Sequence, residues 1–142
     1  MLLQLVYPVT TTEIPILSNH KKSPRLHLLD TGLVIFSAGI QKELFLSKKI
    51  ENTYRGKIAE HIVGQELKSL SDSVRYKLNF WTRESKNANS EVDFIYQFRD
   101  LLIPIEVKAG ATGRLRSLNQ FIDRAPHHIA IRVYSGKFCI EK

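Results

Sequence analysis

Two carboxylates, Asp93 and Glu106, lie in neighbouring apolar segments that a short polar stretch separates. Residues 92–96 and 101–107 are rich in β-branched and apolar side chains, and they are close enough in sequence to form a hairpin. A hairpin that closes symmetrically about residues 99–100 places Asp93 directly opposite Glu106. Like charges in that position destabilise a sheet by up to about 1 kcal/mol. A divalent cation between them would turn the repulsion into coordination, because Mg²⁺ prefers carboxylate oxygens.

Lys108 is the second charged residue of the later segment. Because side chains alternate along a strand, Glu106 and Lys108 share one face, whereas Ile105 and Val107 share the other. The same register places Glu91 opposite Lys108. A simple cross-strand ion pair is therefore an alternative reason for this lysine.

A third acid, Glu60, lies on a predicted helix over residues 54–70, with Asn52 or Thr53 as its N-cap. One apolar stripe is expected on this helix: Ala59, Ile62, Val63, Leu67 and Leu70. Glu60 borders the stripe, and Gly56 and Gly64 leave room beside it for a ligand, a metal or another backbone. The alternative is a solvated flank residue. His61 is predicted to be exposed.

The remaining elements follow from local signals. Strands are expected at residues 2–8, 26–29 and 76–82, and a loop at 84–90. Asp30 or Thr31 would cap a helix that Gly39 ends. A helix over 115–122 is followed by a second hairpin, whose strands are 129–134 and 138–140. From residue 52 the expected order is therefore helix, three strands, helix, and one or two strands.

Composition restricts the class of protein. The chain has 142 residues, a formal net charge of +7 and a single cysteine, Cys139. The charge favours a polyanionic partner such as nucleic acid, although many small basic proteins bind none. One cysteine excludes an internal disulfide framework. No apolar run approaches the roughly 20 residues that cross a bilayer, so a cytoplasmic protein without a membrane partner is expected.

Other chemistries have little support in the sequence. No cysteine and histidine cluster has zinc spacing, and no phosphate-binding loop motif is present. His127 and His128 are adjacent on an expected strand and so face opposite ways. The aromatic side chains Phe80, Trp81 and Tyr96 could stack on bases, but in central strands they are more often core.

Together, Glu60 on a helix, Asp93 on a strand and Glu106-Val107-Lys108 on the next strand resemble the PD-(D/E)XK restriction-endonuclease-like superfamily. The resemblance implies an α/β fold, an αβββαβ core with a mixed central sheet flanked by helices. It departs from the motif at Val92, where the motif has proline. It implies that Glu60, Asp93 and Glu106 hold Mg²⁺ or Mn²⁺ and that these acids and Lys108 are catalytic. It also suggests that Arg116 and Gln120 contact phosphate, although a polar helix face explains both equally well.

A closer resemblance covers most of the chain. Residues 23–33, 55–60, 81–83, 91–94 and 105–110 look like the uncharacterised C-terminal domain found behind an AAA-type ATPase in bacterial and archaeal proteins. It implies that residues 1–51 end a connecting region and that 52–142 form the nuclease-like domain. The chain would then be a fragment or a stand-alone domain, with an ATPase domain or a second copy as further partners.

Two classes of function remain open from the sequence. One is a magnesium-dependent DNA endonuclease, which the three acids and the lysine favour. The other is a DNA-binding or regulatory module of an ATPase that does not cleave, which the absence of a motor from this chain favours.

Overall fold

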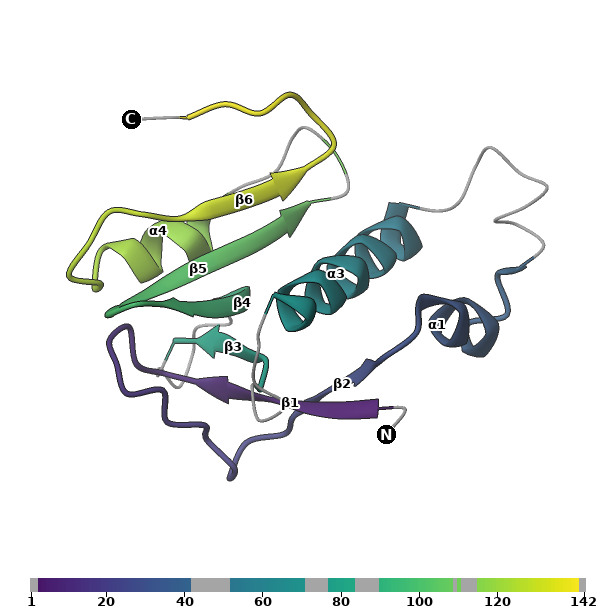
Figure 1. Cartoon of the computed structure of the whole chain (residues 1–142), viewed down its shortest axis with the longest axis horizontal. Coiled ribbons are helices and arrows are strands. Elements are labelled where there is room, and N and C mark those ends of the chain that lie inside the picture. The colour runs from purple at the N-terminus through teal and green to yellow at the C-terminus, as the bar shows by residue number, and fades with distance from the viewer. Residues whose placement is uncertain are drawn as a thin grey trace.

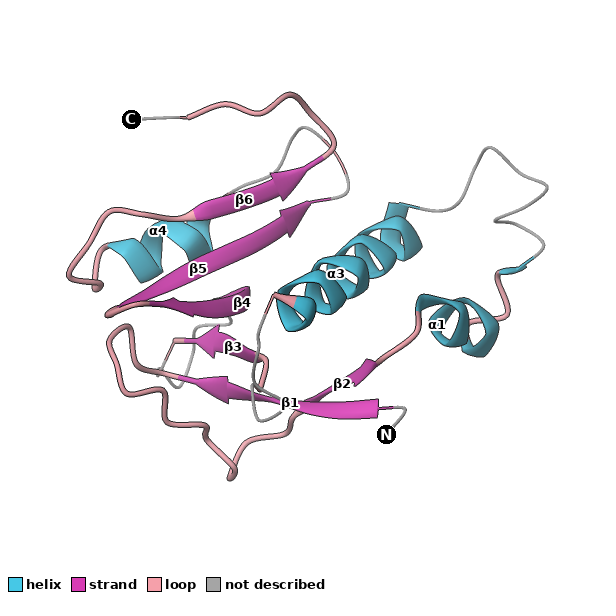
Figure 2. Ribbon diagram, in the orientation of Figure 1, coloured by secondary structure: helices cyan, strands magenta, loops and turns pink. Residues whose placement is uncertain are grey.

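The described residues form an α/β fold around one six-stranded mixed sheet with the strand order β2-β1-β3-β4-β5-β6 (Figures 1 and 2). The computed structural model describes residues 3–41, 52–70, 77–83, 90–108, 110 and 115–140. Its elements are β1 (Leu3–Val9), β2 (Arg25–Leu28), α1 (Thr31–Ser37), α3 (Asn52–Ser69), β3 (Asn79–Thr82), β4 (Glu91–Phe98), β5 (Leu101–Lys108), α4 (Arg116–Ile122) and β6 (Ile131–Tyr134). The predicted fold class and the predicted order of elements after residue 52 are confirmed.

The two faces of the sheet bury separate apolar clusters. On one face Phe94, Ile105 and Val107 pack with Leu67 of α3. On the other, Trp81 and Leu102 pack with Leu118 and Phe121 of α4. The two helices therefore cover opposite faces (Figure 1). Phe80 and Trp81 are buried core residues, as is usual for aromatic side chains in central strands.

The predicted register of the β4–β5 hairpin is confirmed. All five paired positions, from Phe94–Ile105 to Phe98–Leu101, match a hairpin that closes about Arg99 and Asp100. The ladder ends at Phe94–Ile105, so the predicted pair of Asp93 with Glu106 lies beyond it and stays a prediction. Arg99 adopts a positive φ of 56°, which a tight two-residue turn requires. Side-chain alternation and a short loop are both local properties, so the sequence was sufficient to define this pairing.

The N-terminal segment contributes two strands to the same sheet. β1 pairs parallel with β3 and antiparallel with β2. Asp30 caps α1 as expected, since its carboxylate accepts a hydrogen bond from the Leu33 N–H at 3.0 Å. The division at residues 51 and 52 stays a prediction. No helix in the described part of the chain is long and apolar enough to cross a membrane.

The predicted C-terminal hairpin is wrong. β6 pairs parallel with β5 at the edge of the sheet, and residues 138–140 form no strand. Phe138 is 91% exposed and Ile140 is 78% exposed. Short alternating segments around a glycine satisfy the local hairpin pattern, but the apolar side chains of residues 138–140 bury too little surface to stabilise a further strand.

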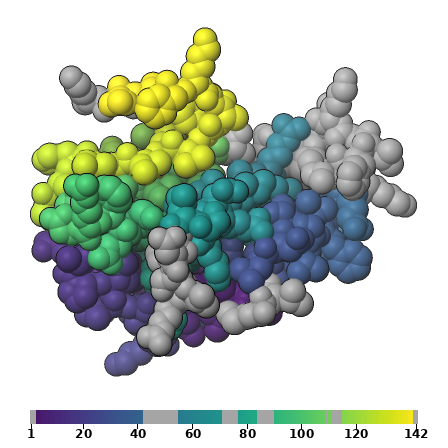
Figure 3. Space-filling model, viewed as in Figure 1, coloured from purple at the N-terminus to yellow at the C-terminus, as the bar shows by residue number. Residues whose placement is uncertain are grey.

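The apolar stripe of α3 is narrower than predicted, and His61 is buried, not exposed. Ala59, Val63 and Leu67 pack on the sheet, whereas Ile62 and Leu70 are exposed. His61 lies under α1, because the Thr31 hydroxyl is 3.3 Å from its Nδ1 and also donates to Gln65. Figure 3 shows α1 (blue) against α3 (teal). The hydrophobic repeat of a helix predicts the face that packs on the core. It does not predict that a second helix will cover another face.

The two glycines of α3 differ in the space around them. A Cβ atom on Gly64 would lie 2.6 Å from His27 Cε1 and 3.0 Å from Phe94 Cζ, whereas no described atom would lie within 4 Å of one on Gly56. Gly64→Ala is expected to destabilise by about 1–2 kcal/mol, because overpacking outweighs the gain in helix propensity. Gly56→Ala should stabilise by up to about 1 kcal/mol. Urea unfolding with an unchanged m-value measures both. Equal effects of the two substitutions would contradict this packing.

Candidate metal and phosphodiester site

Asp93 lies at an irregularity near the start of β4. The pairs Asn79–Ile95 and Trp81–Val92 differ in register, so β4 holds one extra residue between them, as a β-bulge does. The Asp93 Oδ2 atom accepts a hydrogen bond from the Val107 N–H at 2.8 Å. This hydrogen bond holds the Asp93 carboxylate against the backbone of β5 at the residue between Glu106 and Lys108.

Glu106 is 6% exposed and contacts the Lys108 ammonium through its Oε1 atom. Its Oε2 atom is shielded from solvent and has no hydrogen-bond partner among the described residues. A buried carboxylate oxygen without a partner is costly, and a cation or a proton would satisfy it. The alternative pairing of Lys108 with Glu91 is not found, because Glu91 pairs with Arg25.

Arg25, on β2, joins the acids from the N-terminal part of the chain. Its Nη1 lies 3.1 Å from Glu60 Oε1 and 4.0 Å from Asp93 Oδ1, and its Nη2 contacts Glu91. The guanidinium also stacks on Phe80, 4.1 Å from the ring centre. Glu60 is thus a half-buried, ion-paired residue. The motif analysis missed Arg25, because β2 is short and only the sheet topology brings it to β4.

The three predicted acids have raised pKa values. Burial is the largest cause for Glu60, Asp93 and Glu106. Repulsion adds to it: Asp93 raises the pKa of Glu60 and of Glu106. Arg25 and Lys108 lower the pKa values of their neighbours but do not cancel the burial. Electrostatic coupling therefore links the residues that the sequence singled out, and a cation would favour their charged forms.

The donor set suits a hard divalent cation. Glu60, Asp93 and Glu106 offer only carboxylate oxygens, and Glu106 Oε2 has no other partner. In the described residues no three acidic, histidine or cysteine side chains surround one point closely enough to form a ready metal site. Arg25 pairs with Glu60.

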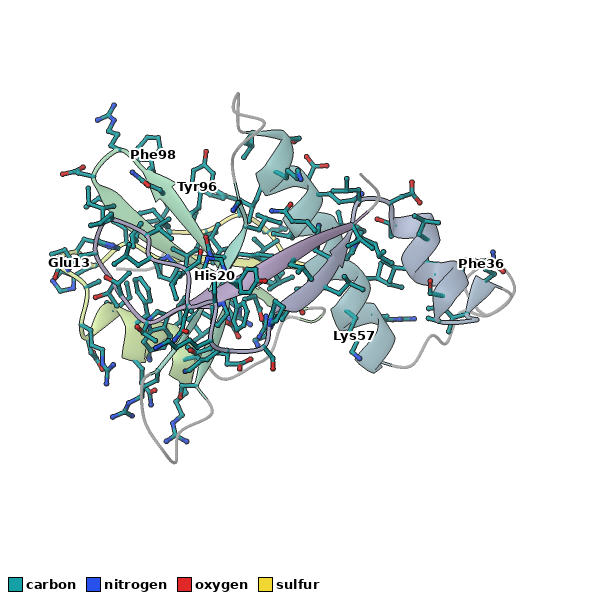
Figure 4. The ribbon with its side chains drawn as sticks, turned by 90° about the horizontal axis from the view of Figure 1, so that it is seen from below. Glu13, His20, Phe36, Lys57, Tyr96 and Phe98 are labelled. Carbon is teal, nitrogen blue, oxygen red and sulfur yellow. The ribbon has the colours of Figure 1, made fainter. Side chains whose placement is uncertain are left out.

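A cavity of about 500 Å³ adjoins two of the three predicted acids. Arg25, Glu60 and Asp93 line it, as does the exposed Lys57 of α3, which Figure 4 labels. Arg116 and Gln120 lie on α4: Arg116 is exposed, and Gln120 is half-buried with a shielded Oε1 that has no partner in the described residues. Their contact with phosphate stays a prediction.

Residues 55–142 match a family model described as a domain of unknown function, DUF4143. The chain belongs to this family. The DUF4143 match includes Glu60, Asp93, Glu106 and Lys108, whereas Arg25 precedes it. No curated protein and no solved structure matches the chain. The predicted kinship with an uncharacterised domain is therefore confirmed, and this family description carries no activity with it.

Proposed function

We propose that this DUF4143 domain is a PD-(D/E)XK-type nuclease-like domain that hydrolyses DNA phosphodiester bonds with Mg²⁺ or Mn²⁺. The observation that carries the proposal is the hydrogen bond from Val107 N–H to Asp93, which holds this carboxylate between Glu106 and Lys108. Asp93 and Glu106 would hold the ion, with Glu60 as the third predicted ligand. A bound ion would polarise the phosphodiester and lower the pKa of an attacking water.

The chain's own residues supply the remaining parts of this chemistry. Lys108 lies beside Glu106, where its ammonium would orient the water and offset negative charge on the pentavalent phosphorus. The net charge of +7 favours approach of a polyanion, and binding should weaken as salt rises. The cavity beside the acids gives the substrate access to Asp93.

One observation favours a non-cleaving role as the second candidate. Arg25 pairs with Glu60 and Glu91, so its guanidinium balances charge that a catalytic metal ion would otherwise balance. The domain would then bind DNA, or regulate an AAA-type ATPase, without cutting.

Cleavage of supercoiled plasmid with Mg²⁺ or Mn²⁺ tests the proposal. The wild-type protein should nick plasmid only when metal is present, and Glu106→Ala or Lys108→Ala should each lower the rate at least about 100-fold, the effect of removing one preorganised electrostatic group. Glu13→Gln is the control, because Glu13 is exposed and lies across the molecule from Lys57 (Figure 4).

Metal-dependent nicking that survives both substitutions would contradict this site. A wild-type protein that binds plasmid in a gel-shift assay but never nicks it would favour the non-cleaving role.

A further inference from the structure

Arg25 contacts carboxylates from two other elements of this centre. Its guanidinium reaches Glu60 on α3 and Glu91 on β4, and it lies 4.0 Å from Asp93. A guanidinium presents its donors in a rigid planar fork, which can bond two carboxylates at once. Arg25 therefore does for Glu60 and Glu91 what a metal ion would otherwise do.

The position of Arg25 is held from several sides. Its backbone pairs with Val6 in the β1–β2 ladder, and its guanidinium stacks on the buried ring of Phe80. Stacking on an aromatic face adds a favourable cation–π interaction. Displacing the side chain would break both ion pairs and this stacking together, so an incoming ion has a strong competitor at Glu60.

The ion pairs of the centre leave little room for a second ion beside Glu60. Arg25 already pairs with Glu60 and Glu91, so a divalent ion there would have to displace its guanidinium. Among the described residues, the carboxylate oxygen that is shielded and has no partner is Glu106 Oε2, and the other oxygen of Glu106 contacts Lys108.

We propose that Arg25 is a built-in second cation, so that the centre takes one divalent ion at Asp93 and Glu106 and not two. The inference rests on the proposed function and deepens it. Glu60 then acts as a partner that positions Arg25, and the ion has two protein carboxylates, with water or phosphate oxygens in its remaining positions. Mg²⁺ commonly binds proteins through one or two carboxylates in this way.

The number of bound Mn²⁺ ions per chain tests this inference without measuring activity. Isothermal titration of the full chain at neutral pH should give one ion for the wild type and two for Arg25→Gln, since that substitution frees Glu60 and Glu91. Arg25→Lys should keep one ion, because the positive charge remains. Arg124→Gln is the matched control, because Arg124 is exposed and contacts the ring of Trp81 instead of these acids. Circular dichroism checks that each variant is folded.

Two ions on the wild-type chain, or one ion on a folded Arg25→Gln variant, would overturn the inference. The wild-type count decides the matter alone if Arg25→Gln does not fold. One bound ion without plasmid cleavage would support Arg25 as second cation and contradict nuclease activity. Cleavage by a wild type with two bound ions would support nuclease activity and contradict Arg25 as second cation. A wild type that binds no ion would contradict both proposals.

Discussion

Asp93→Asn is expected to lower magnesium-dependent cleavage at least about 100-fold while the protein stays folded. The amide oxygen of asparagine can still accept the hydrogen bond that Val107 N–H donates to Asp93. The substitution removes the negative charge but keeps the shape, and an amide is a weaker ligand for a hard cation than a carboxylate. Because burial raises the pKa of Asp93, loss of its charge should not destabilise the fold at neutral pH.

Plasmid nicking and thermal unfolding, measured together, check this expectation. Asp123→Asn is the matched control, because Asp123 is an exposed residue at the end of α4. Wild-type cleavage by a folded Asp93→Asn variant would remove Asp93 from the catalytic centre. A large fall in the melting temperature would show that the carboxylate mainly stabilises the hairpin.

The second large effect concerns the pH dependence of stability. Burial is the main cause that lowers the pKa of His27 from 6.5 to about 4, and the charges of His61 and Lys68 lower it further. His27 is 6% exposed, and its ring stacks on that of His61, with the ring centres 4.5 Å apart. Folded His27 is therefore neutral over a pH range in which an unfolded chain would protonate it.

The sign of the pH effect follows from these two pKa values. Above pH 6.5 His27 is neutral in both states, so it contributes no pH dependence. Between pH 6.5 and about 4 only the unfolded state takes up the proton, so the free energy of unfolding falls as the pH falls. The whole loss is about 3 kcal/mol. The raised pKa values of Glu60, Asp93 and Glu106 act in the opposite direction, because the folded state binds those protons more tightly.

Comparison with His27→Gln isolates the histidine from the carboxylates. Urea unfolding at several pH values should show wild-type stability falling relative to this variant from pH 6.5 to 4. His20→Gln is the control, because His20 is exposed and contacts the ring of Tyr7. Parallel pH profiles for the wild type and His27→Gln would contradict a neutral His27 in the folded state.

Local patterns in the sequence predicted the elements that carry the site. Alternation along β4 and β5, with a short turn between them, predicts the observed register, and the helical repeat predicts α3. Glu60, Asp93, Glu106 and Lys108 are found on the expected elements for the same reason. These properties depend on neighbours within a few residues, so no knowledge of the rest of the chain is needed.

Contacts between distant segments were not predictable in this way. The β-bulge at Asp93 arises from the pairing of β3 with β4, and His61 is buried because α1 docks on α3. β6 pairs with β5, which is distant in sequence, and residues 138–140 form no strand. Each of these features depends on which elements pack side by side. That packing is determined by how the whole chain buries its apolar surface.

The sequence by itself determined the acids, the lysine and the hairpin that brings Asp93 toward Glu106. Only the tertiary structure placed Arg25 among these acids, because β2 reaches them through β1 and the sheet, far from β4 along the chain. A guanidinium inside a carboxylate cluster changes the net charge of the cluster by one unit, as protonation of one carboxylate would. The number of metal ions that we propose for the centre therefore depends on the fold, because the spacing of the acids does not encode the position of Arg25.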